Sequence, residues 1–297
     1  MNAPIRTIVV ATDFSAQADR AIARAARLAV EHGARLRLVH AAPLPLPMPV
    51  WGDMAGGTWI ENSELVAAGE ARMQRQREAL RAEHPIEIDL HCDAAPPVRL
   101  VLGQADEHDA DLVVIGATGE GAVAQRLFGS TAQAIVRHAR RDLLVVRGSS
   151  EHRYRRLLVA SDFSDDATRA AHRARQLAPA AELAVFTALE QPRVRVAWFA
   201  GLDDATRAAN LAKARDAAAA RLRQLAGELG DSDAGMYVRD GVASHELPGV
   251  LAESGAELLA VGAHGKTRLE AGLLGSTSLH AVAESACDVL VVPPLPH

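Results

Sequence analysis

The sequence of 297 residues predicts an α/β protein with two tandem domains, each a doubly wound sheet of five parallel strands. Short apolar segments alternate with helical patterns along the chain, which is typical of parallel strands covered by helices on both faces. The chain also contains an internal repeat: TIVVATDFS at 7–15 matches RLLVASDFS at 156–164, an offset of 149 residues. We therefore expect domain 1 at 1–149 and domain 2 at 150–297.

Strands and helices are expected in the same order in both halves. In the first half, Ser15 and Gly33 are typical residues for the start and the end of a first helix. The other expected helices of this half lie at 60–82, 97–108 and 130–139, and the strands lie at 6–12, 35–41, 86–92, 111–116 and 142–146. In the second half, we expect strands near 156–161, 182–187, 235–239, 257–261 and 288–292. Ligands of such sheets bind beyond the carboxyl ends of the strands, where the strand order reverses.

A glycine pattern, G-x2-G-x9-G-[ST], occurs once in each half, directly after the expected fourth strand. Its positions are Gly116, Gly119, Gly129 and Ser130 in the first half, and Gly262, Gly265, Gly275 and Ser276 in the second. Glycines between a strand and a helix let backbone N–H groups approach a phosphate closely, and a helix N-terminus attracts anions. The pattern predicts nucleotide binding in at least one half. The alternative is that duplicated glycines only shape the two loops.

Other motifs for phosphate binding and for catalysis are excluded. GAHGKT ends like a Walker A loop, but Ala260 stands where that motif requires its first glycine. The dinucleotide motif G-x-G-x-x-G belongs after the first strand, and both first strands end in DFS. No G-x-S-x-G elbow and no Ser-His-Asp or Cys-His arrangement can be identified. We therefore assign no catalytic residue.

An aspartate follows the first strand of each half, at the sheet edge where a ligand is expected. Asp13 and Asp162 could accept hydrogen bonds from ribose hydroxyls or from an adenine amino group. The alternative is that each aspartate holds the turn that leads into Ser15 or Ser164.

The two glycine loops differ in charge. Lys266 and Arg268 lie in the second loop, where cations would neutralise phosphate, and the first loop has Glu120 and Ala122 at these positions. The second half is therefore expected to hold polyphosphate better, although Arg126 partly compensates in the first loop. The alternative is that these are solvated loop charges.

Composition excludes several classes of function. The net charge of −5 is spread over both halves without a basic stripe, so we expect no nucleic-acid partner. No apolar segment reaches the ~18 residues of a membrane-spanning helix, so no membrane partner is expected. Cys92 and Cys287 are too few for a disulfide framework and no signal peptide is apparent, which indicates the cytoplasm. The histidines show no metal-ligand spacing, so no metal site is predicted; His264, within GAHG, could contact a ligand.

These segments resemble a known family over nearly the whole chain. The chain resembles the universal stress protein family in the segments VVATDFS, RLVHA, DLVVIGATG…GST, VGAHGKT…LLGST and DVLVV. Its glycine pattern is similar to that of the ATP-binding branch of this family. The resemblance implies two Rossmann-like, adenine nucleotide alpha hydrolase-like domains that bind ATP, with or without Mg²⁺. It also implies a role in stress response and regulation. Any ATP hydrolysis is expected to be slow, since no positioned base or magnesium-binding pair of carboxylates is evident in the sequence.

The resemblance implies a set of nucleotide-binding residues in each domain. In it, the aspartates contact the adenosine moiety, and the main chain at the end of the second strand meets the base. The set in domain 1 is Ala11, Thr12, Asp13, Ala41, Gly116, Gly119, Gly129, Ser130 and Thr131. The set in domain 2 is Ala160, Ser161, Asp162, Ala188, Gly262, His264, Gly265, Lys266, Gly275, Ser276 and Thr277. Thr118 and Glu120 depart from the histidine and the basic residue that the family often has, and Phe186-Thr187-Ala188 is a less typical strand end than Val39-His40-Ala41.

The last strands, DLLVV and DVLVV, are equivalent apolar edges that need a partner. The resemblance implies that the two domains pair through these strands within one chain, and that the chain forms a homodimer. Two other readings stay open: a nucleotide-free scaffold of the same fold, and an adenylating enzyme, for which no substrate pocket or acid–base pair is identified. The long loop at 43–60, with Trp51 and Trp59, could cover a ligand or bind a partner.

Overall fold

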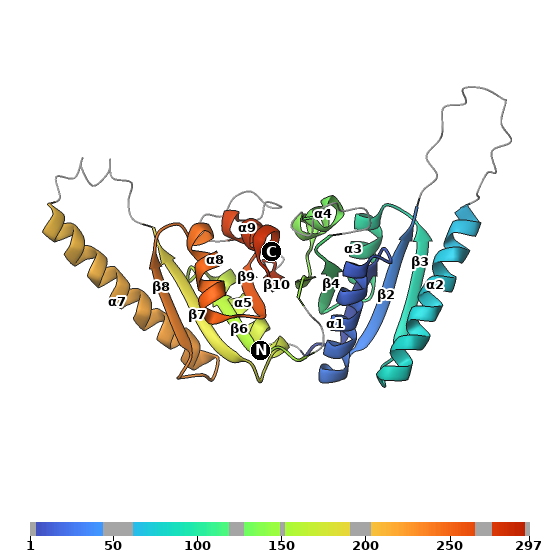
Figure 1. The fold of residues 1–297 in the computed structure, drawn as a ribbon, viewed down its shortest axis with the longest axis horizontal. Coiled ribbons are helices and arrows are strands. Elements are labelled where there is room, and N and C mark those ends of the chain that lie inside the picture. Colours follow the sequence, from blue (N-terminus) through green and yellow to red (C-terminus); the bar gives the residue numbers. More distant parts are fainter. Residues whose placement is uncertain are drawn as a thin grey trace, which may run out of the picture. The chain divides into compact units, whose positions relative to one another are not determined.

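A computed structural model describes residues 4–43, 62–118, 128–148, 152–190, 203–264 and 275–294. The chain divides into two compact units, Pro4–Glu151 and a second that contains His152–His297. We refer to them as domain 1 and domain 2 (Figure 1). Each is a layer of parallel strands with helices packed against it, so the predicted α/β fold is confirmed.

Domain 1 is a five-stranded parallel sheet with four helices in its described part. The strand order is β3-β2-β1-β4-β5, so the order reverses between β1 and β4. The elements are β1 (Thr7–Thr12), α1 (Ala16–His32), β2 (Arg35–Ala42), α2 (Asn62–Glu83), β3 (Ile88–Ala94), α3 (Pro97–Glu107), β4 (Leu112–Gly116), α4 (Ser130–His138) and β5 (Leu143–Val146).

Domain 2 repeats this arrangement. Its strands follow the equivalent order β8-β7-β6-β9-β10, with the reversal between β6 and β9. The elements are β6 (Arg156–Ala160), α5 (Asp165–Leu177), β7 (Glu182–Leu189), α7 (Asp204–Glu228), β8 (Gly235–Asp240), α8 (Ala243–Ser254), β9 (Leu258–Gly262), α9 (Ser276–Glu284) and β10 (Asp288–Val292).

The predicted element boundaries are close to the observed ones, with two informative differences. The third strand, predicted at 86–92, runs from Ile88 to Ala94, because its pairing with β2 continues to Ala42 opposite Ala94. The strand predicted at 182–187 continues to Leu189, which lies opposite Asp240 of β8. In both cases sheet pairing extends the strand beyond its predicted end.

Small residues allow the helices to lie close to the sheets. The face that α1 turns to the sheet includes Ala21, Ala25 and Ala29, all fully buried, and α5 does the same with Ala170 and Ala174. The central strands are buried along most of their length, as expected for parallel strands covered on both faces. The abundant alanines of this chain therefore serve helix–sheet packing as well as helix propensity.

The helices lie on opposite faces of the sheet in domain 1 (Figure 1). On β2, Arg37 donates to Gln104 of α3, whereas His40 on the other face meets Gly69 of α2. The first helix begins at its predicted cap, where Ser15 accepts from the amide of Ala18, and ends at Gly33 with φ 62°. In the part of the chain that the structure describes, no helix combines the length and apolar character needed to cross a bilayer.

Candidate functional site

A cavity of about 400 Å³ lies in domain 1 at the carboxyl ends of the strands. It is lined from β1 and β4, the two strands between which the strand order reverses, and from β2. The starts of α3 and α4 provide further lining. This is the position at which doubly wound sheets bind their ligands.

The structure brings the predicted residues of domain 1 together around this cavity. Every described member of the predicted set contributes to the lining: Ala11, Thr12, Asp13, Ala41, Gly116, Gly129, Ser130 and Thr131. Gly119 lies outside the described residues, as do Glu120, Ala122 and Arg126 of the same loop. Residues far apart in the sequence thus form one site, and their role as nucleotide ligands stays a prediction.

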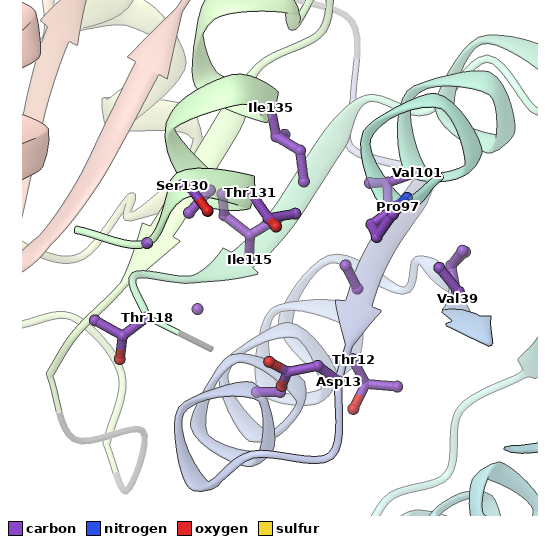
Figure 2. Close-up of a pocket in the computed structure, with 16 residues that line it drawn as sticks. Thr12, Asp13, Val39, Pro97, Val101, Ile115, Thr118, Ser130, Thr131 and Ile135 are labelled. Carbon is purple, nitrogen blue, oxygen red and sulfur yellow. The ribbon is translucent and has the colours of Figure 1, made fainter. Parts of the chain in front are cut away.

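The lining is divided into apolar and polar parts. Figure 2 shows Val39, Pro97 and Val101 on one side of the cavity, and Thr118, Ser130 and Thr131 on the opposite side, with Asp13 at the end of β1. Ile115 and Ile135 add apolar surface. Among the described lining residues, Asp13 carries the only charge. The cavity therefore offers an apolar surface for a flat ring and hydroxyl groups for polar contacts.

Sequence reasoning missed the apolar walls of this cavity. Val39, Val101, Ile115 and Ile135 belong to the same periodic patterns as the core residues of their elements, and no local signal separates a cavity wall from a core position. Pro97 could have been found, because a proline at the start of a helix next to a strand end marks the rim of the sheet.

The turn after β1 shows that Asp13 holds its own loop and also faces the cavity. Its Oδ1 accepts from the amide of Ser15 at 3.0 Å, and Thr12 Oγ1 accepts from the amide of Phe14 at 3.0 Å. Ser15 Oγ then accepts from the amide of Ala18 at 3.2 Å. The two roles considered for Asp13 are compatible, because the turn uses one carboxylate oxygen and the side chain still lines the cavity.

The first glycine of the repeated pattern has a packing role as well. A Cβ on Gly116 would lie 3.1 Å from the carbonyl carbon and oxygen of Gln17, and one on Gly262 would lie 3.0 Å from the carbonyl carbon of Asp166. These neighbours are backbone atoms in the first turn of α1 and α5, so they cannot swing aside. The glycines allow the first helix of each domain to approach the fourth strand, which supports the loop-shaping alternative at this position.

The third glycine of the pattern leaves a helix end without a side-chain cap. Gly129 is the N-cap of α4 and Gly275 is the N-cap of α9, and neither helix has a side-chain hydrogen bond at its cap. By contrast, Ser15 and Ser164 cap α1 and α5. The first amides of a helix need an acceptor, and next to the cavity in domain 1 an anion can serve.

Domain 2 reproduces the turn of domain 1 with matching distances. The amide of Phe163 donates to Ser161 Oγ at 3.0 Å, and the amide of Ser164 donates to Asp162 Oδ1 at 3.0 Å. Ala160 ends β6, Ala188 lies near the end of β7, and Ser276 and Thr277 begin α9. Where the structure describes them, the predicted residues of domain 2 therefore lie on elements equivalent to those of domain 1.

Three equivalent positions differ in side-chain size between the domains. Phe186 lies opposite Ala160 on β7 as Val39 lies opposite Ala11 on β2, and it is fully buried. The two glycine patterns are offset by 146 residues, from Gly116 to Gly262, and by this offset Leu247 and Ala281 stand at the positions of Val101 and Ile135. Three wall positions of the domain 1 cavity therefore carry side chains of a different size at the equivalent positions of domain 2.

His264 lies within the second glycine pattern and is the last residue of the described range 203–264. It is half-buried, and its Nε2 is buried without a hydrogen-bond partner among the described residues. Gly265, Lys266 and Arg268 lie outside the described residues, as does the loop with Trp51 and Trp59. Predictions on these residues stay predictions.

His40 supports the site from the other face of β2. Its Nδ1 lies 2.9 Å from the carbonyl oxygen of Thr12, so Nδ1 carries the proton and donates. Burial lowers the pKa of His40, and the nearby Arg72 lowers it further, while the bond to Thr12 opposes this shift. Burial also raises the pKa of the Cys92 thiol, which lies beside His40 and Gly69. His40 is therefore neutral at neutral pH and tethers the end of β1.

Over the described ranges, no cluster of three or more histidine, cysteine or acidic side chains could hold a metal ion. The lining of the cavity contains hydroxyl and backbone groups and one carboxylate. This set suits a polar organic ligand with an anionic part.

The sequence model described as "Universal stress protein family" matches residues 4–147 and again residues 153–293. This chain belongs to the universal stress protein family. It carries two copies of the family domain, one after the other. The family resemblance that the sequence motifs predicted is thereby confirmed.

Individual proteins and solved structures are similar to this chain. A universal stress protein of Thermus aquaticus is 36% identical over 142 residues, which are 48% of this chain and 98% of the relative. A crystal structure of a universal stress protein from Archaeoglobus fulgidus DSM 4304 has a TM-score of 0.65 at 16% identity, and the match covers 97% of this chain and 98% of that chain. Another universal stress protein, solved in complex with cAMP, is 28% identical with a TM-score of 0.38, and the match covers 50% of this chain and 100% of that chain.

Proposed function

We propose that this tandem universal stress protein binds an adenine nucleotide, ATP, in the cavity of domain 1 and at the equivalent position of domain 2. The observation that carries the proposal is the convergence of the predicted residues of β1, β2, β4 and α4 on one cavity at the switch point of the sheet. In this proposal the protein acts in the cytoplasm in stress response and regulation, and not as a metabolic enzyme.

The division of the lining suggests how the nucleotide is held. The base contacts the apolar walls formed by Val39, Pro97 and Val101, next to the main chain of Ala41. Asp13 accepts hydrogen bonds from the ribose hydroxyls. The phosphates extend toward Ser130 and Thr131, where the uncapped start of α4 and the hydroxyl groups donate to them.

Magnesium fits this site as a companion of the phosphates. The described lining residues include no pair of carboxylates that would hold the ion by themselves. Mg²⁺ commonly keeps several waters and binds substrate phosphates together with few protein groups. The hydroxyls of Ser130 and Thr131 are the protein groups suited to such a shared site, and the ion would neutralise part of the phosphate charge.

The proposal is tested by identifying nucleotide that leaves the purified protein on denaturation, followed by calorimetric titration of the nucleotide-free protein with ATP, ADP, GTP and adenosine. We expect one or two ATP molecules per chain and an affinity for ATP above that for GTP. Absence of released nucleotide together with no heat of binding at millimolar ATP would overturn the proposal.

One observation favours a second candidate, a nucleotide-free scaffold. The packing of Gly116 on α1 and of Gly262 on α5 accounts for the first glycine of each pattern without any ligand. In this reading the fold serves association through the last strands of the two domains. A protein that binds no nucleotide but forms a stable homodimer would support the scaffold.

A further inference from the structure

Two aromatic residues next to the site adopt an unfavourable backbone conformation. Within the described part of the chain, the non-glycine residues with positive φ are Phe14, Asp109 and Phe163. Phe14 has φ 63° and Phe163 has φ 64°, and each directly follows the aspartate of the turn. A bulky residue in the left-handed region is rare and persists only where surrounding contacts hold it.

An arginine from the long helix of each domain supplies such a contact. The guanidinium carbon of Arg72 on α2 lies 4.1 Å from the ring centroid of Phe14, and that of Arg221 on α7 lies 4.1 Å from the ring centroid of Phe163. Both the arginines and the phenylalanines are separated by 149 residues, the offset of the repeat. The duplicated contact is thus the same device in both domains, and its geometry is that of a cation–π interaction.

Each cation–π contact holds the phenylalanine that directly follows the aspartate of the turn. Phe14 lies between Asp13, which lines the cavity, and Ser15, whose amide binds the Asp13 carboxylate. A shift of Phe14 out of the left-handed region would reorient the peptide groups on both sides, and with them the carboxylate. The Phe163 turn has the same bonds. In addition, Arg221 donates to the Phe163 carbonyl oxygen at 3.4 Å.

We propose that Arg72 with Phe14, and Arg221 with Phe163, are positioning pairs that hold Asp13 and Asp162 in the orientation that binds the nucleoside. This inference rests on the proposed function, because the aspartates are its nucleoside ligands. The arginines act through the phenylalanines and do not touch the nucleotide. Each long helix is thereby coupled to the site of its own domain.

The test uses double variants of the full chain in calorimetric titrations with adenosine and with ATP. Arg72→Met with Arg221→Met removes both cations and keeps an unbranched side chain. Arg72→Lys with Arg221→Lys keeps a cation over each ring. The matched control is Arg75→Met with Arg223→Met, which removes exposed arginines from the same two helices.

We expect the methionine pair to weaken adenosine and ATP binding equally, by about 2- to 5-fold, the range that a partly exposed cation–π contact supplies. The lysine pair should restore binding to within about twofold, and the control pair should bind like the unmodified chain. Equal loss for adenosine and ATP separates positioning from a direct contact with phosphate, since adenosine has none. Melting temperatures recorded in parallel identify any general loss of stability.

A second pair of substitutions tests the rings. Phe14→Gly with Phe163→Gly removes both rings, but glycine adopts positive φ without strain, so the turns can form. We expect weaker nucleoside binding without a matching fall in melting temperature.

The outcomes separate this inference from the proposed function. An unmodified chain that binds neither adenosine nor ATP overturns both. An unmodified chain that binds, with a methionine pair of equal affinity, overturns only the positioning pairs. A loss confined to ATP, or a loss that lysine does not rescue, also overturns them.

Discussion

Asp13 illustrates how a single residue can serve both structure and binding. Its carboxylate holds the turn through the amide of Ser15, and the side chain faces the cavity between β1 and β4. The sequence alone offers these two roles as alternatives, because an aspartate before Ser15 fits either one. The turn geometry makes them compatible, and the same geometry recurs at Asp162.

Replacing both aspartates tests their binding role without removing the turns. Asn Oδ1 can still accept from the amides of Ser15 and Ser164, so Asp13→Asn with Asp162→Asn should keep the fold. We expect adenosine affinity to fall about 10- to 100-fold, because a hydrogen bond to a charged acceptor becomes one to a neutral acceptor. Calorimetric titration checks this, with Asp19→Asn, an exposed position on α1, as control. Unchanged adenosine affinity would contradict the assignment.

His40 is expected to make stability depend on pH. Burial lowers its pKa in the folded state, so the unfolded chain binds more protons as pH falls below about 6.5, and this residue then favours unfolding. Its contribution to stability is therefore greater at pH 7.5 than at pH 5.5. Domain 2 has Thr187 at the position of His40. We therefore expect the free energy of unfolding of the His40→Thr variant to fall less between pH 7.5 and pH 5.5 than that of the unmodified chain.

Urea unfolding of both proteins at the two pH values measures the difference. His138→Thr, at an exposed position of α4, is the control and should follow the unmodified chain. Equal pH dependence of the His40→Thr variant and the unmodified chain would show that His40 titrates alike in the folded and unfolded states.

The close approach of the first helix to the fourth strand is an element-scale requirement in both domains. Gly116→Ala and Gly262→Ala place a Cβ 3.0–3.1 Å from backbone of α1 or α5, and we expect each to lower the free energy of unfolding by about 1–3 kcal/mol. Gly103→Ala on α3 and Gly227→Ala on α7 are matched controls, because a Cβ there meets open space.

The two control substitutions should raise the free energy of unfolding, since alanine is favoured over glycine in a helix by about 0.5–1 kcal/mol. Denaturant unfolding measures all four variants. If Gly116→Ala is as stable as Gly103→Ala, the helix and strand can separate at no cost, and the packing explanation of the glycine fails.

The helices and strands could be predicted from the sequence more fully than the residues that form the walls of the cavity. The apolar strands and the caps at Ser15 and Gly33 follow from local patterns, and the repeat supplies each pattern twice. Strand ends such as Ala94 depend on the partner strand, which is distant in sequence. Val39 and Val101 line the cavity only because β2 and α3 meet there, a property of tertiary packing that periodicity does not encode.

At the scale of the whole molecule, the pairing of the two domains through their last strands stays a prediction. A long apolar edge strand needs a partner to satisfy its backbone groups. Within each domain, β5 and β10 are the last strands in the order, and β3 and β8 lie at the opposite edge. If the last strands pair within the chain, their outward amides should be protected from hydrogen exchange at low protein concentration.

Amide exchange followed by mass spectrometry or NMR tests this pairing. The outward amides of β3 and β8 serve as the internal comparison and should exchange faster than those of 143–146 and 288–292. Rapid exchange of the last strands in dilute solution would contradict intramolecular pairing. Sedimentation in the same buffer tests the expected homodimer, with twice the 31.4 kDa mass of one chain.

We propose that an adenine nucleotide occupies the cavity between the carboxyl ends of β1 and β4. Photolabelling with 2-azido-ATP, followed by peptide mapping, tests it most directly, because the azido group sits on the base. We expect labelling on segments that line the apolar wall, around Val39–Ala41 and Pro97–Val101, and its suppression by excess ATP. Labelling that ATP does not suppress, or that falls outside these segments and their domain 2 equivalents, would contradict it.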